Sequence, residues 1–162
     1  MGLVPIVLAW CYEMFRYFIV NHNLPRFHDF LLKINGSRNG GTPVKGGGNI
    51  EMGGPNSNQV IEYVHSYDPR SWTCLHVAEG ALNCNNVTVQ NNDVGPAGSD
   101  SFQQWADGIS VSCRNSIIRN NMVQNPTDGG IVLFGSPGTQ VYNNTIWIVN
   151  VSTEQPCRAL AN

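Results

Sequence analysis

Two aspartates in the second half of the chain each precede a short apolar run. Asp107 stands in WADGISV and Asp128 in PTDGGIVL, so both carboxylates fall at the mouth of an expected strand. If these strands stack about 4.8 Å apart, the carboxylates become near neighbours. Repulsion between like charges raises the pKa of one member of such a pair, which leaves one acid and one base. Hydrolysis of a glycosidic bond requires that division of roles.

Elimination is a second chemistry open to the same carboxylates. A calcium ion held between them and the carboxylate of an acidic sugar assists such reactions, and a Lys, Arg or His then abstracts the proton. Lys33 and His76 are the candidates. The competing interpretation of the aspartates is that each bonds its own backbone and stabilises a bend. The competing interpretation of Lys33 and His76 is that each is a surface residue without a catalytic role.

Two loops that end in tryptophan flank the expected face. Trp72 ends SYDPRSW and Trp105 ends GPAGSDSFQQW. Both residues are candidates for stacking on sugar rings, with capping of the core as the alternative. Arg70 and Arg119 are candidates for pairing with an acidic sugar.

The elements that must position these residues form an internal repeat. RNSIIRNNMVQNPTDGGIVLFGS aligns at a constant offset with FRYFIVNHNLPRFHDFLLKINGS, which pairs Asp128 with Asp29 and Ile131 with Leu32. The unit reads apolar-x-Asn-Asn-x-apolar, then a turn, then Asp-Gly-Ile-x-apolar. Units of about 22 residues without helical periodicity favour short strands over a helical solenoid. Looser copies occupy residues 58–80 and 85–113, and a fifth begins at residue 139.

These strands predict an all-β solenoid of parallel strands in which each rung covers its neighbour. Alternation along the strand after each aspartate assigns the faces. The inward pairs are Leu32 and Ile34, Leu75 and Val77, Ile109 and Val111, and Ile131 and Leu133. The outward column is Lys33, His76, Ser110 and Val132, with Asn35, Ala78, Ser112 and Phe134 one position further out. The pairs Asn91/Asn92, Asn120/Asn121 and Asn143/Asn144 are expected to stack at one corner.

The rungs VTVQNNDVGP, WADGISVSC, SIIRNNMVQNPTDGGIVLFG and QVYNNTIW resemble the right-handed parallel β-helix of the pectin lyase-like superfamily. They are most similar to fungal right-handed β-helix proteins of undetermined activity. The resemblance covers roughly residues 16 to 150 and implies about five rungs. The superfamily includes pectate and alginate lyases, polygalacturonases, epimerases and non-catalytic adhesins and tailspikes, and the fold does not choose among them. The Gly-His-Gly and Arg-x-Lys motifs of polygalacturonases and the calcium pectate lyase signature are absent here.

The composition of the chain limits the kinds of partner that it can bind. A net charge of −2 with only 12% charged residues gives no basic surface for nucleic acid. The five cysteines show no CxxC or His/Cys spacing, so no structural zinc site is expected. Cys74, Cys84 and Cys113 are expected in neighbouring rungs, where Cys84 and Cys113 can meet as a disulfide in an oxidising compartment.

Segment boundaries complete the expectation. Residues 1–15 are expected to form an apolar segment too short to span a bilayer, and residues 16–150 the β-helix. Residues 36–54 are expected to form a Gly-rich excursion from the β-helix, and residues 151–162 a truncated or irregular tail. The sequons at Asn35, Asn86, Asn143 and Asn150 indicate secretion. We therefore expect a secreted, monomeric, polysaccharide-active hydrolase or lyase. No cofactor is expected other than calcium, which is left open. The alternatives are a non-catalytic carbohydrate-binding or structural β-helix, or an inactive fragment.

Overall fold

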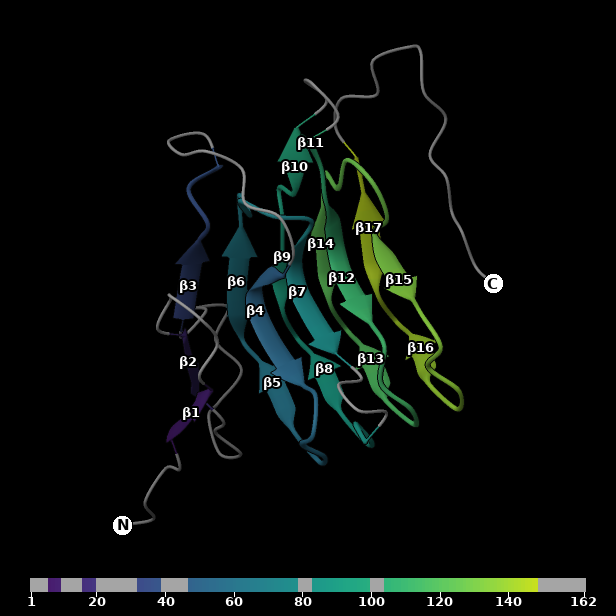
Figure 1. Ribbon diagram of the computed structural model, residues 1–162. Coiled ribbons are helices and arrows are strands. Elements are labelled where there is room, and N and C mark those ends of the chain that lie inside the picture. Colours follow the sequence, from purple (N-terminus) through teal and green to yellow (C-terminus); the bar gives the residue numbers. More distant parts are fainter. Residues whose placement is uncertain are drawn as a thin grey trace.

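The structure is a computed structural model that describes residues 6–9, 16–19, 32–38, 47–78, 83–99 and 104–148, with backbone alone for residues 6–9, 16–19 and 104. The regular elements of this part are short strands (Figure 1). None of the described residues belongs to a helix long and apolar enough to cross a membrane. The strands are β1 (Ile6–Ala9), β2 (Arg16–Ile19), β3 (Leu32–Asn35), β4 (Gly48–Gly53), β5 (Val60–Glu62), β6 (Val64–Tyr67), β7 (Thr73–Ala78), β8 (Thr88–Gln90), β9 (Asp93–Val94), β10 (Gly98–Ser99), β11 (Gln104–Trp105), β12 (Asp107–Val111), β13 (Ile117–Arg119), β14 (Met122–Gln124), β15 (Ile131–Leu133), β16 (Gln140–Tyr142) and β17 (Thr145–Trp147).

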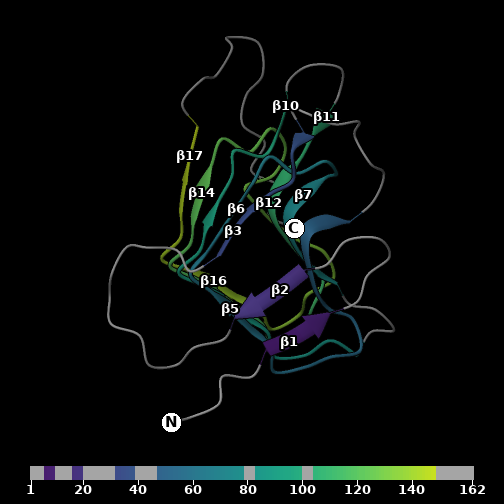
Figure 2. The same cartoon turned by 90° about the vertical axis from the view of Figure 1, so that its left-hand side faces the viewer.

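The strands form three parallel sheets that the chain visits in a fixed order. The sheets run β4–β7–β12–β15, β5–β8–β13–β16 and β3–β6–β9–β14–β17. Viewed from the side in Figure 2, the three sheets form walls around a shared interior. Each pass along the chain adds one strand to each wall, as from β4 to β5 to β6. The expected all-β architecture of parallel strands is confirmed, and it is compatible with a β-helix or solenoid.

The interior is filled by the side chains that alternation assigned to it. Leu75, Val77, Ile109 and Val111 are fully buried, and Ile131 is partly buried against them. Full burial of such a side chain contributes about 1.5–3 kcal/mol. Because the inward positions of β7 and β12 pair in register, the core continues from one strand to the next.

The asparagine corner is also confirmed. The Asn92 side-chain amide donates to the Asn121 Oδ1 at 3.0 Å, and the Asn121 amide donates to the Asn144 Oδ1 at 2.9 Å. Asn91 and Asn120, each preceding a ladder residue, have φ of 54° and 53°. Asparagine tolerates this left-handed conformation better than most residues, which explains why each corner carries two of them.

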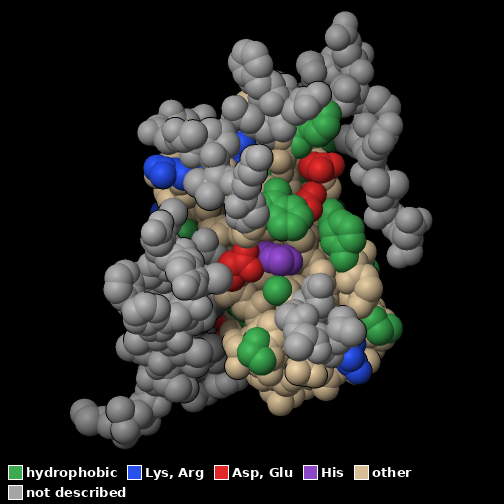
Figure 3. Space-filling model, viewed as in Figure 1, with side chains coloured by type: hydrophobic (Ala, Val, Ile, Leu, Met, Phe, Trp, Pro, Cys, Tyr) green, Lys and Arg blue, Asp and Glu red, His purple; other side chains and the backbone are tan. Residues whose placement is uncertain are grey.

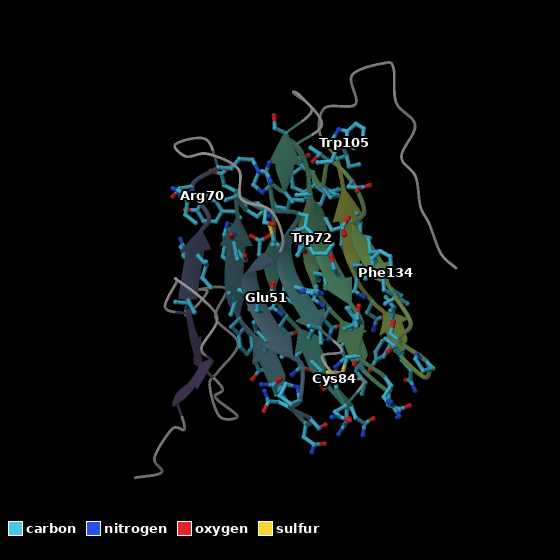
Figure 4. All side chains as sticks on the ribbon, in the orientation of Figure 1. Glu51, Arg70, Trp72, Cys84, Trp105 and Phe134 are labelled. Carbon is cyan, nitrogen blue, oxygen red and sulfur yellow. A yellow bond between two sulfur atoms is a disulfide. The ribbon has the colours of Figure 1, made fainter. Side chains whose placement is uncertain are left out.

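A disulfide joins the two cysteines expected to meet. Cys84 and Cys113 are bonded, with their Cα atoms 5.0 Å apart (Figure 4). Each lies in the connection that leads into the β5–β8–β13–β16 sheet, so the bond links neighbouring passes of the chain. Cys74 is a free, buried thiol, and burial raises its pKa.

Two segments differ from the expected organisation. Strand β2 pairs antiparallel with β1, although residues 16–19 were expected to begin the parallel repeat. Residues 48–53, assigned to the Gly-rich excursion, form β4 in parallel register with β7. Ile50 is buried at an inward position, which gives this glycine-rich segment enough apolar surface to form a strand. Asp29 and Asn150 lie outside the described residues.

Candidate functional site

The outward face of the β4–β7–β12–β15 sheet carries a continuous column of side chains. Glu51 pairs in register with His76, His76 with Ser110, and Ser110 with Val132. Neighbouring positions in such a sheet lie about 4.8 Å apart, so the side chains of the column stack. The expected alignment of His76, Ser110 and Val132 is confirmed, and Glu51 extends it by one strand.

Lys33 does not belong to this column, and that prediction was wrong. It lies on β3, where it is exposed and pairs in register with His65 of β6 in a different sheet. The alignment placed β3 beneath β15 because the strand-turn pattern recurs on every wall of the structure. Sequence similarity alone therefore predicted a strand around Lys33 but not the sheet to which that strand belongs.

Glu51 and His76 form a carboxylate–imidazole pair. The His76 Nδ1 lies 2.9 Å from the Glu51 Oε2, and the Glu51 Oε1 accepts the backbone N–H of Gly48 at 2.5 Å. Both side chains are about one-fifth exposed. A carboxylate at Nδ1 fixes the ring orientation and favours the tautomer with its proton on Nδ1. Acid–base chemistry at the second ring nitrogen is thereby supported.

Asp107 lies at the start of β12 in a largely buried position. Its Oδ1 accepts the backbone N–H of Gly129 and its Oδ2 accepts the Ser110 hydroxyl, both at 2.8 Å. Burial raises the pKa of Asp107 above its ordinary value, the two hydrogen bonds oppose this rise, and the charge of Asp128 adds to it. The charge of Asp128 was expected to raise the pKa of Asp107; burial is instead the largest cause of the rise, and the charge of Asp128 is a smaller one.

Asp128 is not aligned with Asp107. The backbone N–H of Asp128 donates to the Ala106 carbonyl, and Asp107 instead meets Gly129. The cause is visible in the two motifs, because one glycine separates Asp107 from Ile109 whereas two separate Asp128 from Ile131. A shift of one residue changes the direction of a side chain along a strand. Asp128 is exposed, while Asp107 is largely buried.

Exposed aromatic side chains surround the column. Trp72 is 49% exposed and its ring centroid lies 5.8 Å from that of His76. Figure 4 shows Trp72 above Glu51, with Phe134 to one side and Trp105 beyond the upper end of the sheet. In Figure 3, red and purple side chains lie among green ones on this face. The aromatic residues therefore offer apolar contacts beside the ionisable groups.

The two arginines proposed to bind substrate lie elsewhere. Arg119 is on β13, where its Nε donates to the Gln90 Oε1 at 2.8 Å and its Nη1 to the Tyr142 hydroxyl at 3.2 Å. Figure 4 shows Arg70 to the left of Trp72, near the upper ends of β3 and β6. Neither guanidinium joins the ionisable column.

Glu51 was missed because it lies in the Gly-rich stretch. The signal that identifies it is the alternation in GNIEMG, where Ile50 and Met52 are buried and Glu51 between them faces outward. Phe134 was assigned an outward position but no function, and it is 58% exposed.

The described residues contain no group of three or more His, Cys, Asp or Glu side chains placed to hold a metal ion. No protein-family model, no curated protein and no solved structure matches the chain. The functional argument therefore rests on the geometry of the outward face.

Proposed function

We propose that the protein is a right-handed parallel β-helix of about five rungs that binds and hydrolyses a polysaccharide on the outward face of the β4–β7–β12–β15 sheet. One observation carries the proposal. A carboxyl group with a raised pKa, that of Asp107, shares a face with the Glu51–His76 pair and the exposed Trp72. Acid, base and sugar-stacking surface are the three parts that glycosidic hydrolysis needs.

The chemical roles follow from the environments of these groups. Asp107, whose raised pKa favours the protonated form, donates its proton to the glycosidic oxygen as the bond to the anomeric carbon breaks. A water molecule attacks the anomeric carbon and gives its proton to His76. Glu51 holds the imidazole in place through Nδ1 and stabilises the imidazolium that forms. Asp107 then takes a proton from solvent and the His76 imidazolium releases its proton to solvent, which restores both groups.

Hydrolysis is preferred to elimination because of where the described Lys and Arg side chains lie. Elimination from a uronic acid is assisted by a cation that neutralises the sugar carboxylate. Lys33 and Arg119 belong to other sheets, and Arg70 lies away from the column. Extracellular localisation is part of the proposal, and the Cys84–Cys113 disulfide supports it.

Non-catalytic sugar binding is the second candidate function. The observation that favours it is that both oxygens of Asp107 accept hydrogen bonds within the fold, from Gly129 and Ser110. A carboxylate committed to these partners stabilises the loop before β15 without contacting a substrate. The exposed aromatic residues would then bind sugar without cleavage.

Release of reducing ends from a panel of plant, algal and fungal polysaccharides tests the proposal. Asp107→Asn and His76→Gln each lower the rate by about 10²–10⁴-fold while leaving binding largely intact. Lys33→Gln, which changes an exposed residue of another sheet, is the matched control and retains the rate. Binding without cleavage by the unmodified protein supports the second candidate. Cleavage that survives both Asp107→Asn and His76→Gln refutes the catalytic roles.

A further inference from the structure

The four strands of the proposed site lack basic residues. Their sequences are GNIEMG, TCLHVA, DGISV and IVL, and they contain two carboxylates, one imidazole and no Lys or Arg. Asp128, in the loop before β15, adds a further exposed carboxylate close enough to raise the pKa of Asp107. Glu51 and Asp128 are therefore carboxyl groups of this face that no Lys or Arg of the four strands balances.

Of the described basic residues close to these strands in sequence, Arg70 lies to the left of Trp72 (Figure 4), and Arg38 and Arg114 lie outside the four strands. Arg38 donates through its guanidinium to the carbonyl oxygens of Pro69 and Ser71, and so braces the loop before β7. Arg114 lies in the connection after β12, which leads to another sheet. In Figure 3 no blue side chain lies among the red and purple ones at the middle of the face. The described part of the chain thus supplies no Lys or Arg to meet a sugar carboxylate there.

The same face is well suited to uncharged sugar rings. Trp72 and Phe134 are 49% and 58% exposed, and both flank the ionisable column (Figure 4). Flat aromatic surfaces pack against the apolar faces of sugar rings, and carboxylates accept hydrogen bonds from sugar hydroxyls. A chain of uronic acids would instead bring one negative charge per residue towards Glu51 and Asp128.

We infer that the substrate is an uncharged polysaccharide and that the carboxyl groups of Glu51 and Asp128 discriminate against polyuronates. The inference rests on the proposed function and names its substrate class. Repulsion at distances of a few ångströms to about 10 Å weakens binding of a uronate oligomer by roughly tenfold or more at low ionic strength. The discrimination falls as salt screens the charges, whereas binding of the neutral oligomer changes little.

Isothermal titration calorimetry with a glucose hexamer and a galacturonate hexamer, at low and high salt, tests the inference. The unmodified protein binds the glucose hexamer at least about tenfold more tightly at low salt. Asp128→Lys places a cation on the face and lowers the ratio of the glucose-hexamer affinity to the galacturonate-hexamer affinity several-fold. Gln140→Lys, which adds the same charge at an exposed position of β16 on another sheet, leaves the ratio unchanged.

The outcomes separate this inference from the proposed function. Galacturonate bound as tightly as glucose, or an equal response to Asp128→Lys and Gln140→Lys, overturns the charge discrimination while sugar binding stands. Trp72→Ala weakens binding of the glucose hexamer if the face is the binding site. Binding that is indifferent to Trp72→Ala, or no binding of either hexamer, overturns the proposed site and the inference with it.

Discussion

Replacing Asn121 by Asp tests whether the asparagine ladder organises the corner of the fold. Asn121 is 2% exposed, and its Oδ1 accepts hydrogen bonds from the backbone and side-chain nitrogens of Asn92. Its amide nitrogen donates to the Val89 carbonyl at 3.0 Å and to the Asn144 Oδ1 at 2.9 Å. A carboxylate keeps the two accepted bonds, loses both donated ones, and faces two oxygens in a buried site.

The magnitude follows from those two lost bonds. The Asn144 Oδ1 keeps the backbone N–H of Asn121 as a donor, so each lost side-chain bond costs about 0.5–1.5 kcal/mol. Burial of the new carboxylate beside these oxygens adds about 1–3 kcal/mol, so Asn121→Asp lowers the free energy of unfolding by roughly 2–6 kcal/mol at pH 7. Burial and the facing oxygens raise the folded-state pKa of the introduced carboxyl above the unfolded value of about 3.9. The loss is therefore smallest below about pH 4, where a proton restores one donor, and grows as pH rises through the folded-state pKa.

Urea unfolding followed by tryptophan fluorescence at pH 3 and pH 7 measures the effect relative to the unmodified protein. Asn120→Asp is the matched control, because Asn120 is exposed, has φ of 53°, and Asp also tolerates this conformation. It changes stability by no more than about 0.5 kcal/mol at pH 7. An Asn121→Asp loss equal to that of the control, or greater at pH 3 than at pH 7, would refute the ladder's assigned role.

Three further predictions concern the disulfide and the surroundings of Asp107. Replacing both Cys84 and Cys113 by Ser opens a loop of sequence separation 29 and lowers the free energy of unfolding by about 3.5 kcal/mol in urea titrations, a difference that reductant abolishes. Because the pKa of Asp107 is raised in the folded state, its contribution to stability is present below about pH 4 and is lost as pH rises through the folded pKa. Asp107→Asn therefore gains stability relative to the unmodified protein between pH 3 and pH 7, and thermal unfolding that shows the opposite trend contradicts the shift. Gly129→Ala places a Cβ 2.1 Å from the Val132 Cγ2 and 2.9 Å from the Asp107 Oδ1, and it should lower the melting temperature by an amount equivalent to about 1–3 kcal/mol, as calorimetry can check.

The strand architecture could be predicted because its local signals are strong. Alternation placed Leu75, Val77 and Ile109 in the core, and the paired asparagines marked one corner. Both signals act over a few residues, so they survive insertions such as the β10–β11 hairpin. The Cys84–Cys113 disulfide followed from the same stacking.

The site was harder to predict because it depends on which wall each strand joins. Every pass of the chain contains several similar strand-turn units, and the pattern around Lys33 therefore aligned with that of a strand on another wall. One additional glycine moved Asp128 out of phase with Asp107. Glu51 was hidden among glycines, since only burial of Ile50 and Met52 distinguishes β4 from a loop.

The central claim is that the outward face of the β4–β7–β12–β15 sheet is the sugar-binding site, and amide and indole NMR shifts locate that site directly. Titration with a glucose hexamer is predicted to shift the indole N–H signal of Trp72 and the backbone amides of residues 73–78 and 107–111. Strands β6 and β9, on another wall, serve as the internal reference and remain unperturbed. Shifts confined to β6 and β9, or the absence of any shift at a hexamer concentration that saturates binding, would contradict the account.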